Sequence, residues 1–320
     1  MFKLKKKILT IATVVLVGTF GLVGCSNSSS EVDNEPLKVT LVLTEGGVND
    51  QSFNQSAWEG AVKAAEEYDV EVSYLECNKK GDYASNIETA IDNESDLVIG
   101  VGYEMADKIK EAAEDYPDQQ FAIIDGSYEE TPANVKSILF NEEEAGYSVG
   151  LIAAKITETN KLGFVGGMDI PSVSNFAVGF ERGAKEVNSD IEVLIHYANS
   201  FTDAAKGKAI STQMINDNVD IIFTAGGGVN TGVFETCNEV GAKAIGVDMP
   251  SNYISPDVII TSALKNVGTG VQLTIKDLVE GNFKGGVAQV YDLTNGGVGY
   301  EDTAHITDEV KAFVEEKISK

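Results

Sequence analysis

The sequence predicts an α/β protein made of two doubly wound lobes, each built on a parallel sheet. Short β-branched runs alternate with amphipathic helical stretches from Lys38 onward, which is the pattern of βαβ units. After Asn141 the alternation starts a second time. The ordered chain of roughly 280 residues also exceeds what a single core usually fills. These observations together indicate two lobes of the same design.

The first series of elements alternates regularly between short apolar runs and helical stretches. Its first helix repeats Ala57, Ala61 and Ala64 at helical spacing, as one buried helix face requires. We expect strands over Val39–Leu43, Val70–Leu75, Leu97–Val101, Phe121–Ile124 and Val135–Phe140, and helices over Ser52–Tyr68, Tyr83–Asn93 and Met105–Asp115.

The second series repeats the first and then breaks the alternation. We expect strands over Leu162–Val165, Val193–Tyr197, Ile221–Thr224 and Ala244–Val247, with helices over Ser172–Val187, Ala204–Asn216 and Gly232–Val240. The end of the chain adds a strand over Val258–Leu264, a helix over Val267–Glu280, a strand over Val287–Leu293 and a last helix over Asp308–Lys320. These extra elements suggest that the chain crosses back between the lobes and forms a hinge on which they can close. We expect lobe 1 to comprise 37–140 with about 265–290, and lobe 2 to comprise 141–264 with about 291–320.

The first 24 residues read as a signal peptide. Four lysines between positions 3 and 7 precede an uncharged run from Ile8 to Gly24, which ends in Leu22-Val23-Gly24-Cys25, a sequence that resembles the lipobox of bacterial lipoproteins. A transmembrane anchor is the alternative, because the 17 uncharged residues reach the lower end of the about 17–25 that span a bilayer. We expect cleavage before Cys25, lipidation of Cys25, a flexible tether over 25–36, and a protein held at the extracellular face of the cell membrane.

Charge and composition exclude several classes of function. Removal of the four leader lysines leaves 20 basic against 50 acidic residues, a formal charge of about −30, which would repel a nucleic-acid backbone. His196 and His305 are the only histidines, and neither has metal-ligand spacing, so we expect no metal and no cofactor. Cys77 and Cys237 are far apart in the sequence and form no CxxC motif. Two buried free thiols are the favoured interpretation, and a disulfide between them is the alternative.

Candidate ligand residues follow the apolar runs, because open parallel sheets bind ligands at the carboxyl ends of their strands. The stretch Gly46–Gly60 carries a predicted strand through a glycine turn into a helix whose first turn holds Phe53 and Asn54. Its alternative role is structural, with Asn49, Asp50 and Ser52 capping the helix and Phe53 in the core. Asp125, Phe201, Asp248 and Lys265 also follow or end apolar runs; each has a similar alternative as a cap, a core residue or a solvated strand end.

Two glycine-rich stretches lack the motifs of nucleotide-binding enzymes. Gly226-Gly227-Gly228 is not followed by Gly-Lys-Ser/Thr, and Gly163–Gly167 does not fit GxGxxG, so neither predicts a phosphate loop or a dinucleotide fold. We expect these glycines to let the backbone come close to a ligand.

Several blocks resemble the basic membrane protein family, lipoprotein substrate-binding subunits of ABC transporters related to purine nucleoside receptors. The resemblance covers residues 37–285 and rests on Gly46–Gly60, Phe164–Asp169, Gly179–Gly183, Ser200–Asp203 with Lys206-Gly207, and Gly246–Asp248. It implies a type I periplasmic-binding-protein fold whose lobes clamp a nucleoside. It also implies that Phe53 and Phe201 stack on the base, that Asn54 and Asp125 hydrogen-bond it, and that Gly227, Asp248 and Lys265 surround the ribose.

One position departs from the family pattern. Many relatives have an acidic residue for the ribose nine positions before the first stacking Phe, where this chain has Thr44. Ribose recognition is therefore less firmly implied than the fold, and Thr44, Asn49 and Asp50 are further candidates.

The resulting hypothesis is a monomeric, non-enzymatic binding protein. It captures a nucleoside, with purines favoured because two large rings make the best sandwich, and delivers it to an ABC transporter permease. The alternatives are a sugar- or signal-binding sensor of the same fold and a nucleoside hydrolase acting through Asp125 or Asp248.

Overall fold

The computed structural model describes residues 35–319. The predicted signal peptide, Cys25 and most of the predicted tether lie outside these residues, as does Lys320. From Pro36 onward the chain forms one compact unit.

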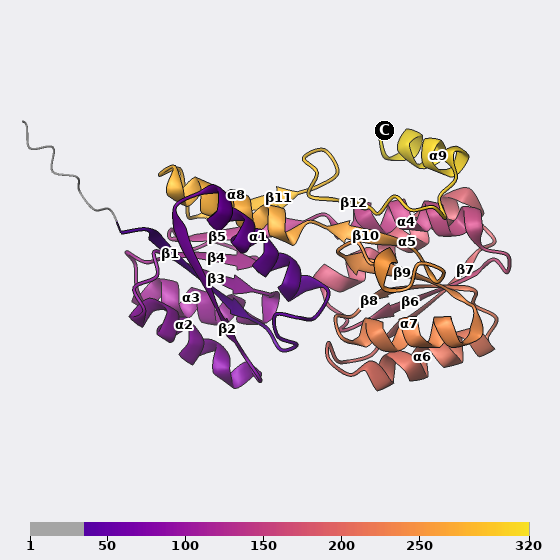
Figure 1. Ribbon diagram of the computed structural model, residues 1–320, viewed down its shortest axis with the longest axis horizontal. Helices are drawn as coiled ribbons and strands as arrows, with labels where there is room; N and C mark the ends of the chain where they lie inside the picture. Colours follow the sequence, from indigo (N-terminus) through magenta and orange to yellow (C-terminus); the bar gives the residue numbers. More distant parts are fainter. Residues whose placement is uncertain (1–34, 320) are drawn as a thin grey trace, which may run out of the picture. The chain divides into compact units, whose positions relative to one another are not determined.

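The first sheet has six strands in the order β11-β5-β4-β3-β1-β2 (Figure 1). All its pairings are parallel, and β1 is bonded to the edge strand β2 on one side and to β3 on the other. The strands are β1 (Leu37–Leu43), β2 (Val70–Glu76), β3 (Leu97–Val101), β4 (Gln120–Ile124), β5 (Val135–Phe140) and β11 (Val287–Tyr291).

The second sheet repeats this topology in the order β12-β10-β9-β8-β6-β7. Its pairings are parallel except that between β10 and β12, which is antiparallel. The strands are β6 (Lys161–Gly166), β7 (Glu192–Tyr197), β8 (Ile221–Ala225), β9 (Lys243–Asp248), β10 (Ile259–Lys265) and β12 (Val298–Tyr300).

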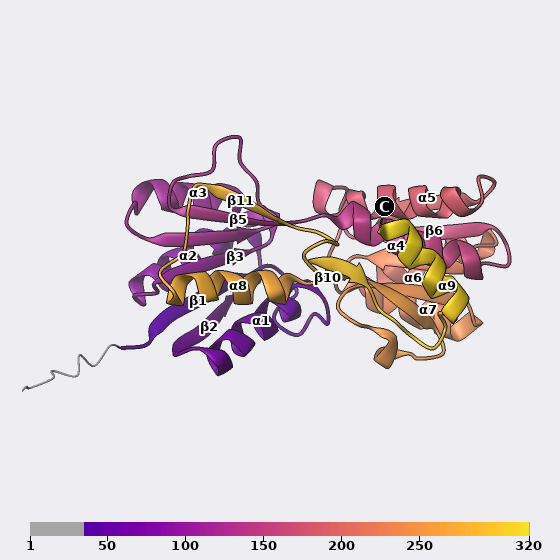
Figure 2. The same ribbon diagram turned by 90° about the horizontal axis from the view of Figure 1, so that it is seen from above.

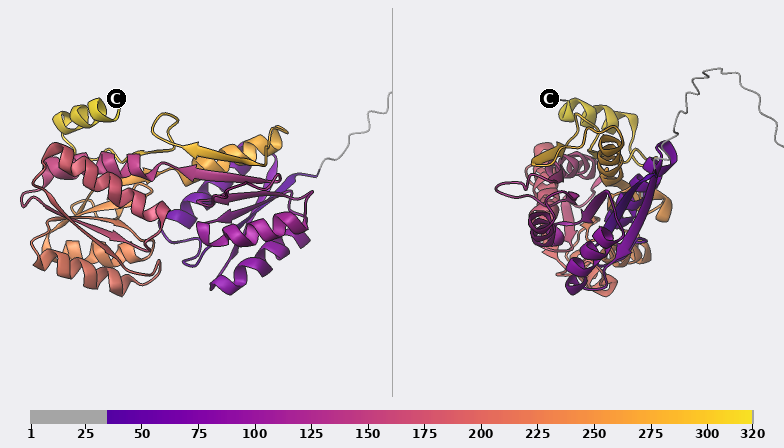
Figure 3. Two further views of the ribbon diagram at one scale, coloured as in Figure 1. Left: turned by 180° about the vertical axis from the view of Figure 1, so that it is seen from behind. Right: turned by 90° about the vertical axis from the view of Figure 1, so that its left-hand side faces the viewer.

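Helices cover both faces of each sheet. In Figures 1 and 2, α1 and α8 lie over one face of the first sheet, and α2 and α3 lie over the other. Figure 3 shows α4 and α5 on one face of the second sheet and α6 and α7 on the opposite face, while α9 packs against α4. The helices are α1 (Phe53–Glu67), α2 (Tyr83–Asp92), α3 (Ala106–Asp115), α4 (Glu142–Ile156), α5 (Pro171–Val187), α6 (Ala204–Asn216), α7 (Val229–Val240), α8 (Val267–Val279) and α9 (Asp308–Ile318), with short 3₁₀ turns at Lys80–Asp82, Tyr103–Met105 and Asn252–Ile254.

The core follows from the alternation of side chains along buried strands. On β1, Leu41 and Leu43 point to the layer under α1 and α8, while Val42 points to the layer under α2 and α3. On β6, Phe164 and Val165 are divided between two layers in the same way. Two covered faces explain why an inner strand such as β3 is continuously apolar and not alternately polar.

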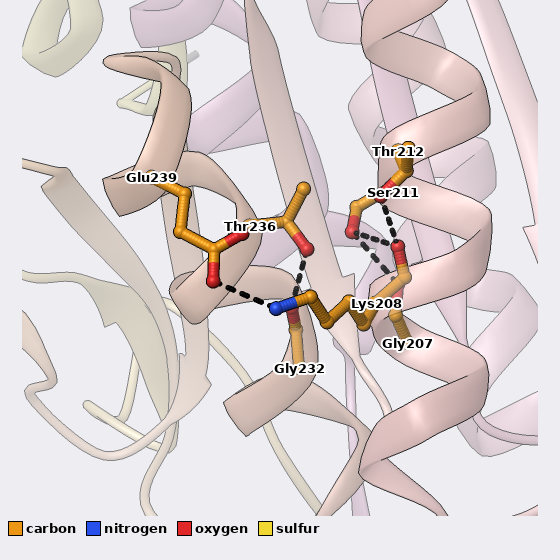
Figure 4. A network of polar contacts seen from close by, with 7 residues as sticks. All are labelled: Gly207, Lys208, Ser211, Thr212, Gly232, Thr236 and Glu239. Carbon is orange, nitrogen blue, oxygen red and sulfur yellow. Dashed lines mark hydrogen bonds and ion pairs between the residues drawn. The ribbon is translucent and has the colours of Figure 1, made fainter.

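On the second sheet, glycines let α5 pack against α4 and α7 pack against α6, backbone against backbone. A Cβ on Gly179 of α5 would overlap the Glu143 carbonyl of α4, and a Cβ on Gly232 of α7 would overlap the Ala204 carbonyl of α6. Figure 4 shows the α6–α7 contact, where Lys208 pairs with Glu239 at 2.7 Å and Thr236 donates to the Gly232 carbonyl. These pairs of helices are therefore closely packed units.

The structure confirms the α/β class, the two doubly wound lobes and the multi-strand hinge. The chain passes between the sheets from β5 to α4, from β10 to α8 and from β11 to β12. Each predicted strand and helix is present with ends shifted by a few residues at most; Lys320, the last residue of the last predicted helix, lies outside the described part. Cys77 and Cys237 are buried and free, as favoured above.

Two elements were not predicted. Helix α4 shows no single apolar face in sequence because it is enclosed by α5, α9, β10 and β12, and its glycines at 146 and 150 lie in the contact with α5. Strand β12 has only three residues, which is too short to give a periodic signal.

Candidate functional site

The carboxyl ends of the strands of both sheets border one cleft of about 300 Å³. Each of the principal predicted residues lines it: Phe53, Asn54, Asp125, Phe201, Gly227, Asp248 and Lys265. Thr44 and Asp50 also line the cleft, whereas Asn49 is exposed and does not. A cleft of this size at the ends of parallel strands is a usual place for a small-molecule ligand.

Two aromatic rings reach the cleft from opposite lobes. Phe53 is the first residue of α1, and Phe201 lies in the loop between β7 and α6; both are half-buried. Each ring lies against glycine backbone. A Cβ on Gly102 would lie 3.6 Å from Cε1 of Phe53, and a Cβ on Gly167 would overlap the ring of Phe201.

Gly227 supplies bare backbone beside the second ring. It has φ of 59°, and a Cβ there would lie 2.9 Å from the Phe201 carbonyl oxygen. That same oxygen accepts from the Gly228 N–H at 2.8 Å. A side chain at position 227 would therefore strain the loop that carries Phe201.

The start of α1 is capped by Asp50. Its carboxylate accepts from the backbone N–H groups of Ser52, Asn54 and Gln55 at 2.9–3.1 Å. Burial raises the pKa of Asp50, and these hydrogen bonds oppose the rise. The capping role considered for this residue is thus present, while its side chain also borders the cleft.

Thr44 fixes the side-chain amide of Asn54. The Thr44 N–H donates to Oδ1 of Asn54 at 3.3 Å, and Oγ1 of Thr44 lies 3.0 Å from the same oxygen. Because a backbone N–H can only donate, the atom that it meets must be the amide oxygen. Thr44 is therefore bonded to a neighbouring candidate residue.

Lys265, the last residue of β10, is the centre of a buried cluster of charges. Its Nζ lies 2.6 Å from Oδ2 of Asp125 and 2.9 Å from Oε1 of Glu142, and the Lys265 side chain is 2% exposed. The ammonium also lies 5.3 Å from the centroids of the Phe53 and Phe140 rings, within the range of cation–π attraction. Three elements, β4, α4 and β10, thus meet at one ammonium group.

The cluster holds more carboxyl groups than ammonium groups. Burial raises the pKa of Asp248 to about 6 although Lys265 opposes the rise, and burial with the charge of Glu142 likewise raises the pKa of Asp125. Burial alone would lower the pKa of Lys265, but the carboxylates of Asp125, Glu142 and Asp248 outweigh it and raise the pKa. Lys265 therefore stays charged, and the aspartates are poised between their two protonation states at moderately acid pH.

Asp125 and Asp248 occupy equivalent places in the two lobes. Each ends or follows a parallel strand, and both have left-handed backbone, with φ of 62° and 63°. Such backbone is uncommon for residues other than glycine and recurs at functional sites. Among the described residues, Oδ1 of Asp125 is buried and has no hydrogen-bond partner, so it is an acceptor available to a ligand.

Sequence reasoning missed several residues of the site. Glu142 directly follows the Asn141 at the end of β5, and applying the strand-end rule to Val135–Phe140 would have pointed to it. Lys80 and Glu104 line the cleft and pair at 2.7 Å, but neither follows a strand directly. Val173 and Phe176 line it from the first turns of α5, where apolar residues read as core.

The arrangement suits recognition of a small polar molecule with a flat face. It offers two rings, carboxylate acceptors and one buried ammonium donor. No group of three or more metal-ligating side chains is found within residues 35–319. In the same residues no helix has the length and apolar character needed to span a bilayer.

A solved solute-binding protein shares this architecture. A solute-binding protein of an ABC transporter from Aeropyrum pernix K1 superposes with a TM-score of 0.80 and 33% identity, over 88% of this chain and 81% of that one. The two lobes and the cleft between them, together with the 33% identity to this neighbour, place the chain among substrate-binding proteins of the ABC transporter type.

The sequence comparisons identify the family. Residues 37–320 match the Bmp family, described as ABC transporter substrate-binding protein PnrA-like. The ABC transporter nucleoside-binding protein BmpA of Lactococcus lactis is 35% identical over 92% of this chain and 91% of its own length. Basic membrane protein A of Borreliella burgdorferi is 37% identical over 91% of this chain and 86% of its own length. The chain belongs to the Bmp family, which confirms the resemblance found in the sequence.

Proposed function

We propose that this protein captures nucleosides, with purine nucleosides preferred, and delivers them to the permease of an ABC transporter. The observation that carries the proposal is the pair Phe53 and Phe201, which face one cleft from opposite lobes beside Asp125, Asp248 and Lys265. Stacking of a base on an aromatic ring contributes about 1–3 kcal/mol per base. The printed name of the Lactococcus lactis relative, a nucleoside-binding protein, supports the same ligand class.

The polar residues of the cleft supply complementary contacts for a nucleoside. The unpartnered Oδ1 of Asp125 accepts a hydrogen from the base, and Asn54, held by Thr44, reads the base beside it. Asp248 accepts a hydrogen bond from a ribose hydroxyl. Lys265 has three N–H donors; two of them meet Asp125 and Glu142, and the third donates to the ribose. Hydrogen bonds to charged groups contribute about 1.5–3 kcal/mol each.

Calorimetric titration with adenosine, guanosine, inosine, uridine and cytidine tests the ligand class. We expect binding of the purine nucleosides, weaker binding of the pyrimidines, and loss of binding in Phe53→Ala. Binding of D-ribose with no response to any nucleoside would reassign the protein to sugar sensing. Release of free base from bound inosine over hours would support a hydrolase.

The proposal includes a lipid anchor on Cys25, which lies outside the described residues. Buried acyl chains contribute about 0.8 kcal/mol per CH₂, and two chains suffice for stable anchoring. Mass spectrometry of the mature amino terminus should show a diacylated cysteine at position 25. An unmodified mature amino terminus at any other residue would contradict this part of the proposal without affecting the ligand class.

A further inference from the structure

Ser52 precedes a helix but does not cap it with its side chain, as a serine in this position usually does. It is the residue before α1, yet its side chain makes no capping hydrogen bond. Asp50 takes that role by accepting from three backbone N–H groups of the first turn. The hydroxyl of Ser52 is therefore free for another partner, although the residue is only 1% exposed.

That partner belongs to the other lobe. Oγ of Ser52 donates to Oδ2 of Asp248, across 196 positions of sequence. Ser52 follows the end of β1 in the first sheet, and Asp248 ends β9 in the second. Both side chains are buried, and a hydrogen bond to a carboxylate gains strength in such low-dielectric surroundings.

We propose that Ser52 is a positioning residue that latches the two lobes together through Asp248. The inference rests on the proposed function only for the nature of the ligand. Since a side-chain hydrogen bond is lost once donor and acceptor separate beyond about 3.5 Å, this one exists only while the lobes stand close. It therefore stabilises the closed arrangement of the lobes.

The latch also leaves the ligand site usable. Ser52 occupies Oδ2 of Asp248, so Oδ1 remains as an acceptor in the cleft that Asp248 lines. A protein that already populates its binding-competent state loses less affinity to conformational change. Ser52 thus orients Asp248 and increases the population of the closed state with one hydrogen bond.

A matched control lies one helical turn away. Ser56 is also a buried serine, but its Oγ accepts from the Gly268 N–H of α8, which packs on α1 within the first lobe. Ser56→Ala removes a buried hydroxyl and a hydrogen bond without touching the contact between lobes. Ser52→Thr retains a hydroxyl at the latch.

The test combines small-angle X-ray scattering of dialysed, ligand-free protein with stopped-flow dissociation of inosine. We expect Ser52→Ala to increase the radius of gyration and to speed inosine dissociation about tenfold, a factor that corresponds to about 1.4 kcal/mol. Ser52→Thr should restore both values, and Ser56→Ala should change neither.

Three results would overturn the latch: unchanged scattering and dissociation in Ser52→Ala, equal shifts in Ser56→Ala, or a Ser52→Thr protein that behaves like Ser52→Ala. The scattering comparison needs no nucleoside. If wild-type protein binds no nucleoside but Ser52→Ala still expands, the proposed function fails and the latch stands.

Discussion

Replacing Lys265 by methionine should destabilise the protein strongly and in a pH-dependent way. Methionine keeps most of the length of the buried side chain but removes the ammonium that faces Asp125 at 2.6 Å and Glu142 at 2.9 Å. Asp248 also loses a nearby positive charge. The substitution leaves three buried carboxyl groups with no ammonium among them.

The magnitude follows from the cost of leaving buried charges unpaired. Breaking a buried ion pair by removing one partner costs about 3–5 kcal/mol, which is a large share of the 5–15 kcal/mol that stabilises a typical domain. The carboxyl groups can reduce this cost by taking up protons. Because Lys265 now holds the pKa values of Asp125 and Asp248 below what burial alone would give, both pKa values rise further in Lys265→Met.

The sign of the pH dependence is fixed by proton binding. The folded Lys265→Met protein binds more protons than the same chain when unfolded. This difference begins at about pH 4, the usual pKa of aspartate, and extends beyond about pH 6, the pKa of Asp248 in the wild type. Its free energy of unfolding therefore falls as the pH rises through this window. Urea unfolding should show a loss of about 3–5 kcal/mol at pH 8 and a clearly smaller loss at pH 5.

Lys136 provides the control. It is another buried lysine, and it pairs with a single carboxylate, that of Asp277, at 2.7 Å. The Asp277 side chain is 38% exposed, so water can hydrate it when Lys136 is removed. Lys136→Met should therefore cost less and vary little with pH. A loss in Lys265→Met below about 1 kcal/mol, or one equal at pH 5 and pH 8, would refute the reasoning.

Three further predictions concern binding and are measured by calorimetry. Phe201→Ala should weaken inosine binding by about 1–3 kcal/mol, and an unchanged affinity would remove this ring from the site. Inosine affinity should fall as the pH drops below about 6, because burial raises the pKa of Asp248 to that value and protonation removes the acceptor; constant affinity from pH 7.5 to 5 would exclude Asp248 as the acceptor. Nucleoside monophosphates should bind at least about 100-fold more weakly than nucleosides, because each like-charge contact costs energy in a desolvated site; comparable binding of adenosine and its monophosphate would contradict this. The cleft lining has five carboxyl side chains and two lysines: Glu45, Asp50, Glu104, Asp125, Asp248, Lys80 and Lys265.

The sequence was informative about strand ends because parallel strands buried on both faces leave continuous apolar runs. The runs before Asp125 and Asp248 end at polar residues, and in a parallel sheet these ends lie on one edge. Seven residues chosen in this way and by family resemblance border one cleft. The ends of the apolar runs and the family resemblance together thus pointed to the edge of each sheet where a ligand could bind.

The contacts between the lobes could not be read in the same way. Periodicity reports burial within an element, but it does not report which strand end of one sheet faces which strand end of the other. Ser52 looks like a helix cap in sequence, and its partner Asp248 is 196 positions away. Glu142 opens a helix whose apolar residues face several neighbours at once, so neither the helix nor its buried carboxylate gave a periodic signal.

The position of Lys265 explains why the hinge is part of the site. Asp125 and Asp248 end strands of different lobes and share strained backbone, with φ near 60°, which costs about 1–3 kcal/mol for each residue. Lys265 lies where β10 leaves the second sheet for α8, and Glu142 lies where β5 leaves the first sheet for α4. The one ammonium that offsets these carboxylates therefore belongs to a segment that passes between the lobes. The second lobe contributes Asp248, Glu142 and Lys265, whereas Asp125 comes from the first, so the cluster is complete only when the hinge brings the lobes together.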